Sequence, residues 1–110
     1  MLTYQQACDK LRGKQSKKLE NNTYLIRVDE KTVAIRLHST NVVTITEENH
    51  YTLNSGGWHT ATTKDRLNHY GPVCIHQENF SWYVGRGKGL EFHDGMTFDH
   101  IGNLLESSKL

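Results

Sequence analysis

The spacing of apolar residues near the start of the chain predicts one short helix. Apolar side chains recur there at the i, i+3, i+4 and i+7 spacing of a single helix face, at Tyr4, Ala7, Cys8 and Leu11. Thr3 and Gln6 have the spacing of a capping box, and Gly13 follows as a helix terminator. We therefore expect an amphipathic helix that ends close to Gly13. Residues 14–22 have no clear period, and we expect them to form a basic connection.

From residue 24 the pattern changes to the alternation of apolar and polar side chains that is typical of strands. Alternating runs at residues 24–28 and 33–37 flank a polar turn at residues 29–31, which predicts a hairpin. Polar turns also border the apolar run at residues 42–46, and a fourth run covers residues 51–53. Four successive strands joined by short turns predict an antiparallel meander.

The second half of the chain adds a short helix and further strands. The helix is expected at residues 63–70, because Gly71 follows its end and Pro72 prevents its continuation. Further strands are expected at residues 73–77, 80–84, 90–92 and 96–98. Residues 100–110 are expected to form a peripheral tail. Together these elements predict an α+β fold with a twisted antiparallel sheet, in one domain that spans residues 1–110.

The composition agrees with a single folded domain. The 110 residues are 35% hydrophobic and 23% charged, which supplies enough apolar surface for one core. No apolar run approaches the ~20 residues of a membrane-spanning helix, so we expect a soluble intracellular protein with no membrane partner. Cys8 and Cys74 lack a CxxC or metal-ligand spacing, and we expect both to be small buried side chains.

Basic residues concentrate near the N-terminus, although the net charge of the whole chain is only +1. In residues 1–18 a single carboxylate, Asp9, accompanies five cations, which are Lys10, Arg12, Lys14, Lys17 and Lys18. Such a cluster is typical of a surface that contacts nucleic acid or a nucleoprotein. A duplex-binding domain usually has a larger positive net charge than this chain. Nucleic-acid binding by these residues is therefore the alternative to binding of a small anionic ligand.

The segment from Ser55 to Arg66 combines several features of an anion site. Paired glycines allow successive backbone N–H groups to face one concavity, and the start of a helix supplies further N–H donors. Trp58 offers an aromatic face for a base. The candidate ligand-binding residues of this segment are Gly56, Gly57, Trp58, Thr60, Thr62, Thr63, Lys64 and Arg66. The alternative interpretation is a glycine turn before an ordinarily capped helix, with Trp58 in the core and the cations solvated.

Strand alternation adds a second group of candidate residues. Arg27 and Arg36 lie on the two strands of the first predicted hairpin, where they could approach each other and grip a phosphate. The alternative is a solvated sheet face. If the helix at residues 63–70 packs over that face, Arg36, His38 and Thr40 would join Lys64 and Arg66 in one pocket.

The sequence contains no motif of a known catalytic or metal site. There is no GxSxG, HExxH or paired-carboxylate pattern, and the Walker and dinucleotide-binding glycine patterns are also absent. We therefore expect no metal and no cofactor. A small metal-independent ribonuclease stays as an alternative, in which His38 with His59 or His76 would exchange protons beside Arg36.

Several segments together resemble a known group of proteins. They are residues 21–25 (NNTYL), 36–44 (RLHSTNVVT), 53–68 (LNSGGWHTATTKDRLN), 82–83 (WY) and 94–96 (DGM). In these segments, over about residues 8–99, the chain resembles small bacteriophage and prophage proteins that have no assigned activity. The resemblance implies a phage origin and hence the host cytoplasm as the place of action. It implies no mechanism.

We therefore expect a non-enzymatic phage protein that binds a nucleotide or a related phosphorylated ligand. Such a protein can sequester a signal of host defence, and it needs a preformed pocket but no general base. Homo-oligomerisation is one way to complete such a pocket. The alternatives are an interaction protein that contacts nucleic acid or a host defence complex through the basic N-terminal residues, the ribonuclease, and a virion component.

Overall fold

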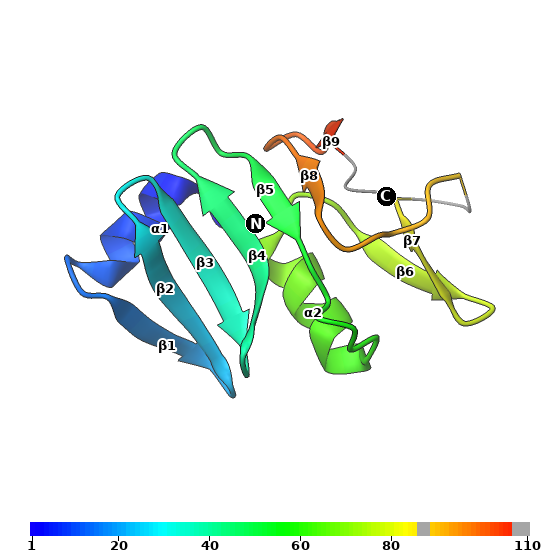
Figure 1. Ribbon diagram of the computed structural model, residues 1–110, viewed down its shortest axis with the longest axis horizontal. Helices are drawn as coiled ribbons and strands as arrows, with labels where there is room; N and C mark the ends of the chain where they lie inside the picture. The colour runs from blue at the N-terminus through cyan, green and yellow to red at the C-terminus, as the bar shows by residue number, and fades with distance from the viewer. Residues whose placement is uncertain (86–88, 107–110) are drawn as a thin grey trace.

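The structure is a computed structural model that describes residues 1–85 and 89–106. These residues form two helices and nine strands (Figure 1). The helices are α1 (Tyr4–Leu11) and α2 (Ala61–Tyr70). The strands are β1 (Ser16–Glu20), β2 (Thr23–Asp29), β3 (Thr32–Leu37), β4 (Thr40–Thr46), β5 (Tyr51–Leu53), β6 (Ile75–Glu78), β7 (Ser81–Val84), β8 (Met96–Phe98) and β9 (Leu104–Glu106). Seven strands form one antiparallel sheet in the order β1-β2-β3-β4-β5-β8-β9, and β6 pairs with β7 separately. The predicted α+β class is confirmed.

The first helix and the meander form as their patterns predict. Thr3 and Gln6 make both hydrogen bonds of the capping box, since the Gln6 N–H donates to Thr3 Oγ1 at 3.1 Å and the Thr3 N–H donates to Gln6 Oε1 at 2.9 Å. Ala7 and Leu11 are buried on the face that meets the sheet. Strands β2 to β5 then pair in sequence, each antiparallel to the one before it.

The predicted basic connection at residues 14–22 is wrong, because residues 16–20 form the edge strand β1. Its backbone pairs with β2, with Lys18 opposite Tyr24. An edge strand exposed on both sides has little need for apolar residues, so the period that identifies a half-buried strand is missing here. Only Leu19 of this strand packs against the core.

The predicted elements of the second half differ from the structure at their ends. Helix α2 begins two residues earlier than expected, because Thr60 caps it by accepting the Thr63 N–H at 3.2 Å. Residues 90–92 form no strand and contribute one isolated bridge, between Tyr83 and Glu91. Within the predicted tail, residues 104–106 pair with β8 as the exposed strand β9, and residues 107–110 lie outside the described residues.

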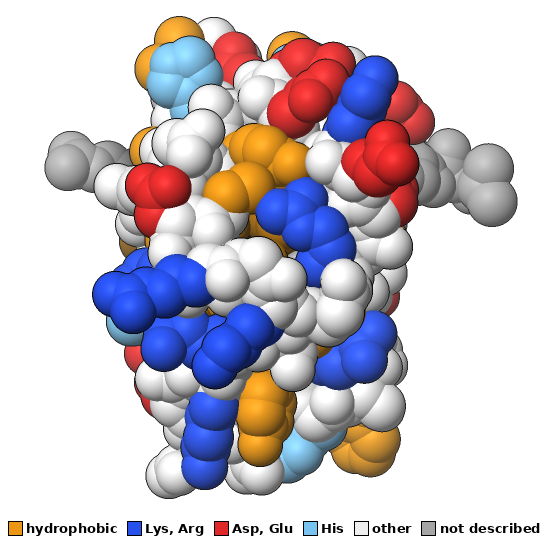
Figure 2. Space-filling view, turned by 90° about the vertical axis from the view of Figure 1, so that its left-hand side faces the viewer, with side chains coloured by type: hydrophobic (Ala, Val, Ile, Leu, Met, Phe, Trp, Pro, Cys, Tyr) orange, Lys and Arg blue, Asp and Glu red, His pale blue; other side chains and the backbone are white. Residues whose placement is uncertain are grey.

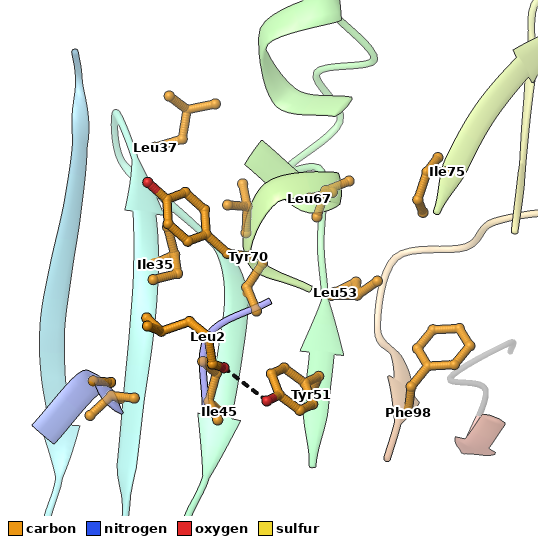
Figure 3. Packing of buried hydrophobic residues seen from close by; sticks show 14 of the residues in the cluster. Leu2, Ile35, Leu37, Ile45, Tyr51, Leu53, Leu67, Tyr70, Ile75 and Phe98 are labelled. Carbon is orange, nitrogen blue, oxygen red and sulfur yellow. Dashed lines mark hydrogen bonds between the residues drawn. The ribbon is translucent and has the colours of Figure 1, made fainter. Parts of the chain in front are cut away.

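The core lies between one face of the sheet and the two helices (Figure 3). Leu25, Ile35, Ile45 and Leu53 reach it from consecutive strands, and Leu67 reaches it from α2. The N-terminal residues pass through the same layer, where the Tyr51 hydroxyl donates to the Leu2 carbonyl at 2.8 Å.

Neither of the two helices in the described residues lies on the opposite face of the sheet (Figure 1). Both helices lie behind the sheet in Figure 1, so the viewer sees this open face directly. Because side chains alternate along a strand, the neighbours of the core residues point to this side. They form cross-strand rows, of which one runs from Lys18 through Tyr24 to Arg36.

Candidate functional site

A pocket of about 440 Å³ opens where the β3–β4 turn meets the loop before α2. We call it the Trp58 pocket. It is lined by Leu37, His38, Ser39, Thr40, Val42, Ser55, Trp58, Thr60, Thr62 and Thr63. Six of these side chains carry hydroxyl groups, and Leu37 and Val42 supply an apolar floor. The pocket therefore offers many weak hydrogen-bonding groups beside one large aromatic ring.

The loop at residues 54–58 is fixed by its own hydrogen bonds. Asp94 Oδ1 accepts from both the backbone N–H and the hydroxyl of Ser55, each at 2.8 Å. Gly56 has φ +65° and lies so close to Thr40 that a Cβ there would be 2.5 Å from the Thr40 Oγ1 atom. Only glycine fits this position. The loop is thereby pressed against the start of β4, which forms the other wall of the pocket.

The expected role of the glycine N–H groups is not confirmed. The Gly56 N–H donates to Asn54 Oδ1 at 2.7 Å, and the Gly57 N–H donates to Ser55 Oγ at 3.2 Å. These donors are therefore used inside the loop. At the start of α2 the Thr60 side chain accepts the Thr63 N–H, which leaves the N–H groups before Thr63 as the ones that lack an intrahelical partner.

Trp58 lies on the surface, which excludes the alternative that places it in the core. Its exposed fraction is 67%, whereas that of Trp82 is 2%. The core role belongs to Trp82, on which the ring of His59 stacks at a centroid distance of 4.2 Å. Trp58 thus presents its indole beside the pocket at little cost to the packing of the core.

The structure brings together only part of the predicted site. Six of the predicted residues line the pocket, namely His38, Thr40, Trp58, Thr60, Thr62 and Thr63. Gly56 and Gly57 shape the loop. Arg36, Lys64 and Arg66 lie outside the lining, so none of the lining residues is a lysine or an arginine.

Arg66 is held in a structural network instead. Its Nε atom donates to the buried Thr23 hydroxyl at 2.8 Å, and its Nη1 atom lies 3.4 Å from Glu20 Oε1. The Tyr70 hydroxyl donates to the other carboxylate oxygen of Glu20 at 2.5 Å. Arg66 therefore joins α2 to the β1–β2 turn, and its side chain is only 12% exposed.

Arg27 and Arg36 do not form a pair, and that prediction is wrong. Arg27 lies opposite Val33 and Arg36 lies opposite Tyr24, at different positions along the hairpin and on opposite faces of the sheet. The Arg27 guanidinium donates to the Tyr4 hydroxyl at 2.9 Å and to Cys8 Sγ at 3.0 Å, so it joins α1 to β2. The Arg36 Nε atom donates to Asn41 at 2.9 Å.

The cysteines and most of the predicted histidines lie apart from one another in the described residues. Cys8 is partly exposed and Cys74 is exposed, so the expectation that both are buried is wrong. His38 lines the pocket, but His59 stacks on Trp82 and His76 lies beside Tyr83 on the β6–β7 hairpin. No group of three or more His, Cys, Asp or Glu side chains in the described residues could hold a metal ion.

The basic N-terminal residues line a second concave surface, between the end of α1 and β1. This hollow has a volume of about 660 Å³. We call it the basic hollow, and it is lined by Asp9, Lys10, Leu11, Arg12, Lys14, Ser16, Lys17 and Lys18. All five predicted cations are therefore on one surface. Figure 2 shows Lys and Arg side chains gathered on this side of the molecule, with Asp and Glu concentrated toward its upper end.

The fold and these two surfaces define a small α+β protein with a seven-stranded antiparallel sheet and a separate two-stranded one. Residues 3–99 match the family model described as Kyanoviridae Gp96 protein, so the chain belongs to this family of bacteriophage proteins. The resemblance to phage proteins is thereby confirmed at the level of the family. No curated protein and no solved structure matches the chain. Neither of the helices in the described part of the chain is long and apolar enough to cross a membrane.

Proposed function

We propose that this phage protein binds a small phosphorylated ligand with a planar ring, of the nucleotide class, in the Trp58 pocket. The observation that carries the proposal is the exposed indole of Trp58 beside a preformed, hydroxyl-lined pocket at the start of α2. A binding role needs no catalytic group. In a phage protein, such binding would sequester a nucleotide that signals host defence.

In this proposal the planar ring of the ligand stacks on the indole of Trp58. Stacking of a base on an aromatic side chain is worth about 1 to 3 kcal/mol and accepts any base, because every base has a π-face. Trp58 is available for this contact because Trp82 fills the core position. Leu37 and Val42 in the lining add apolar contact area for the same ring.

In this proposal the phosphate of the ligand binds at the N-terminal end of α2. Thr62 of the first turn lies in the pocket wall and offers its hydroxyl, and the N-terminal end of a helix favours an anion. The Thr60 hydroxyl already caps the helix by accepting the Thr63 N–H. Because the described residues of the lining include neither lysine nor arginine, the pocket suits a ligand of low charge, such as a monophosphate or a cyclic phosphodiester.

Calorimetric titration with AMP and with a cyclic dinucleotide tests this proposal. Trp58→Ala should weaken binding by about tenfold or more, and Trp58→Phe should retain part of the affinity. Thr62→Val should weaken binding less, since it removes one hydroxyl and keeps the shape.

Lys64→Ala is the matched control, because Lys64 lies on the first turns of α2 but outside the lining. It should bind as the unchanged protein does. Equal binding by Trp58→Ala and the unchanged protein would contradict the proposal. Cleavage of a phosphodiester bond of the cyclic dinucleotide, lost in His38→Ala, would replace it with the ribonuclease alternative.

A further inference from the structure

We propose that the open face of the sheet, at the β1 edge, binds single-stranded nucleic acid independently of the Trp58 pocket. The row from Lys18 through Tyr24 to Arg36 would stack one base, and the cations of the basic hollow would contact the adjoining phosphates. The argument rests on the register of three strands, on the exposure of the row and on the distribution of charge around it.

Strand register places an aromatic ring between two cations. Lys18 of β1 lies opposite Tyr24 of β2, and Tyr24 lies opposite Arg36 of β3. Directly opposed residues on one sheet face have Cβ atoms about 5 Å apart, so the three side chains are neighbours. All three are exposed, and the exposed fraction of Tyr24 is 40%.

No long polar side chain lies in the neighbouring row of this face, in which Ala34 is buried and Ile26 and Thr44 are partly exposed. The next row of the same face consists of Ser16, Ile26, Ala34 and Thr44, whose side chains are short or apolar. The face carries no helix (Figure 1). An unpaired base can therefore lie on the Tyr24 ring without displacing any element, and stacking of this kind is the common way in which sheets hold single strands.

The positive charge continues around the edge of the sheet. Lys17 and Lys18 are consecutive residues of the edge strand β1, so their side chains leave it on opposite sides. Lys18 joins the Tyr24 row and also lines the rim of the basic hollow, in which Lys17 lies with Lys10, Arg12 and Lys14. A phosphate backbone that crosses this edge meets cations on both sides of it.

Negative charge lies at the other end of the strands. Asp29 and Glu30 are in the β2–β3 turn, and Glu47 and Glu48 are in the β4–β5 turn. Figure 2 shows the same separation, with acidic side chains above and basic ones below. The net charge of +1 therefore conceals a polarised molecule, in which one end of the sheet attracts a polyanion.

These features favour a single strand over a duplex. A paired base cannot reach a tyrosine on a flat sheet, whereas an unpaired base can. The basic surface is also local, while duplex binding typically requires a broad positive surface. DNA and RNA single strands share the required chemistry, and comparison of the two in the same assay shows which of them is preferred.

Fluorescence anisotropy with labelled single strands of about 12 nucleotides tests the proposal. Tyr24→Ala should weaken binding by between about 5-fold and about 150-fold, the range that loss of one stacked base gives. Tyr24→Phe should bind as the unchanged protein does, since the ring is retained. Lys18→Gln should reduce the slope of log affinity against log salt by about 0.7, the value for one phosphate on a single strand.

Two control variants separate this surface from general charge effects and from the Trp58 pocket. Lys31→Gln removes a cation at the acidic end of the sheet, beside Glu47, and should leave binding unchanged. Trp58→Ala should also leave it unchanged, so failure of the pocket proposal would not affect this result. Circular dichroism confirms that each variant is folded.

Three results would overturn the inference. One is equal binding of the single strand by Tyr24→Ala and the unchanged protein. The second is tighter binding of a duplex of the same sequence. The third is binding of anionic lipid vesicles or of an acidic peptide together with no binding of either single strand, which would assign the surface to another partner.

Discussion

The Trp58 pocket and the basic hollow differ in how their polar groups are held. In the pocket, the loop is fixed by hydrogen bonds from Ser55 to Asp94 and by the close approach of Gly56 to Thr40. In the basic hollow, all five cations are exposed side chains, which extend from the end of α1, from the edge strand β1 and from the connection between them. The first surface is preorganised and has no lysine or arginine, and the second is charged and adaptable.

This difference shows that cations close in sequence to a pocket need not belong to it. Arg66 follows the pocket residues Thr62 and Thr63, yet its long side chain extends to Glu20 of β1 and Thr23 of β2 and does not line the pocket. The two surfaces therefore suit different ligands. Rigid hydroxyls and one ring suit a small molecule, whereas exposed lysines suit a polyanion.

Removal of Arg66 should have the largest effect on stability. Arg66→Ala should lower the free energy of unfolding by about 2 kcal/mol, because it removes the hydrogen bond to the buried Thr23 hydroxyl and the cation beside the Glu20 carboxylate. Urea denaturation measures the change. Lys64→Ala, on the same helix, should change stability by about 0.5 kcal/mol or less. Equal losses in the two variants would contradict the structural role of Arg66.

A side chain at Gly56 should distort the pocket wall. Gly56→Ala places a side chain at a positive φ and against Thr40, and these two effects together should lower the free energy of unfolding by about 2 kcal/mol. Gly57→Ala is the matched control, because Gly57 also has a positive φ but a Cβ there meets nothing within 4 Å. Gly57→Ala should lower the free energy of unfolding by about 1 kcal/mol. If both variants lose the same stability, the loop does not press against Thr40 as described.

Stability should fall at alkaline pH. Burial and the hydrogen bond to Glu20 raise the pKa of Tyr70 above its ordinary value of 10.0, and burial also raises the pKa of Tyr51. Since both folded-state pKa values are raised, the stabilisation is fully present below pH 10.0 and is lost as the pH rises above it.

Unfolding measured at pH 8 and at pH 11 tests this pH dependence, with Tyr70→Phe as the comparison. The variant should lose less stability between the two pH values, because it has no phenol to ionise at this position. An identical loss in the variant would show that Tyr70 makes no contribution to the alkaline transition.

Neutralising the basic hollow should have the smallest effect on folding. Lys14→Gln and Lys17→Gln should each change the free energy of unfolding by about 0.5 kcal/mol or less, because exposed cations contribute little to stability. Thermal denaturation measures this. A loss comparable to that of Arg66→Ala would mean that the hollow is a structural feature and would remove the contrast between the two surfaces.

The regular elements were largely predictable from local patterns. The capping box of Thr3 and Gln6 and the alternation in residues 24–37 depend on neighbours in the chain, so the sequence alone predicts them. Strand β1 was missed because an edge strand of mostly exposed residues lacks an apolar period. Its partner β2 provides the hydrogen bonds that make it a strand, and this information is tertiary.

The pocket was predictable in part. The glycine pair and the helix start mark its loop, and six of the predicted residues line it. The destinations of Arg27 and Arg66 were not predictable, because each depends on partners more than 15 residues away, such as Cys8 and Thr23. The pocket residues Ser39 and Ser55 were not among the candidates, although both lie within the segments that carry the family resemblance.

The Tyr24 row also required the structure. An exposed tyrosine in an alternating strand looks like any other outward residue, and its neighbours Lys18 and Arg36 are known only from the register. Register joins residues that lie on three different strands. The single-strand surface therefore follows from topology, while the basic hollow was already visible as a cluster along the chain.

The most direct test of the central claim is mass spectrometry of small molecules released from the protein on denaturation. The protein and its Trp58→Ala variant would be purified from phage-infected cells under identical conditions. The account predicts about one chemically intact nucleotide per chain in the unchanged protein and much less in the variant. Absence of any nucleotide from the unchanged protein, or equal amounts in both, would contradict the assignment of the Trp58 pocket as a nucleotide site.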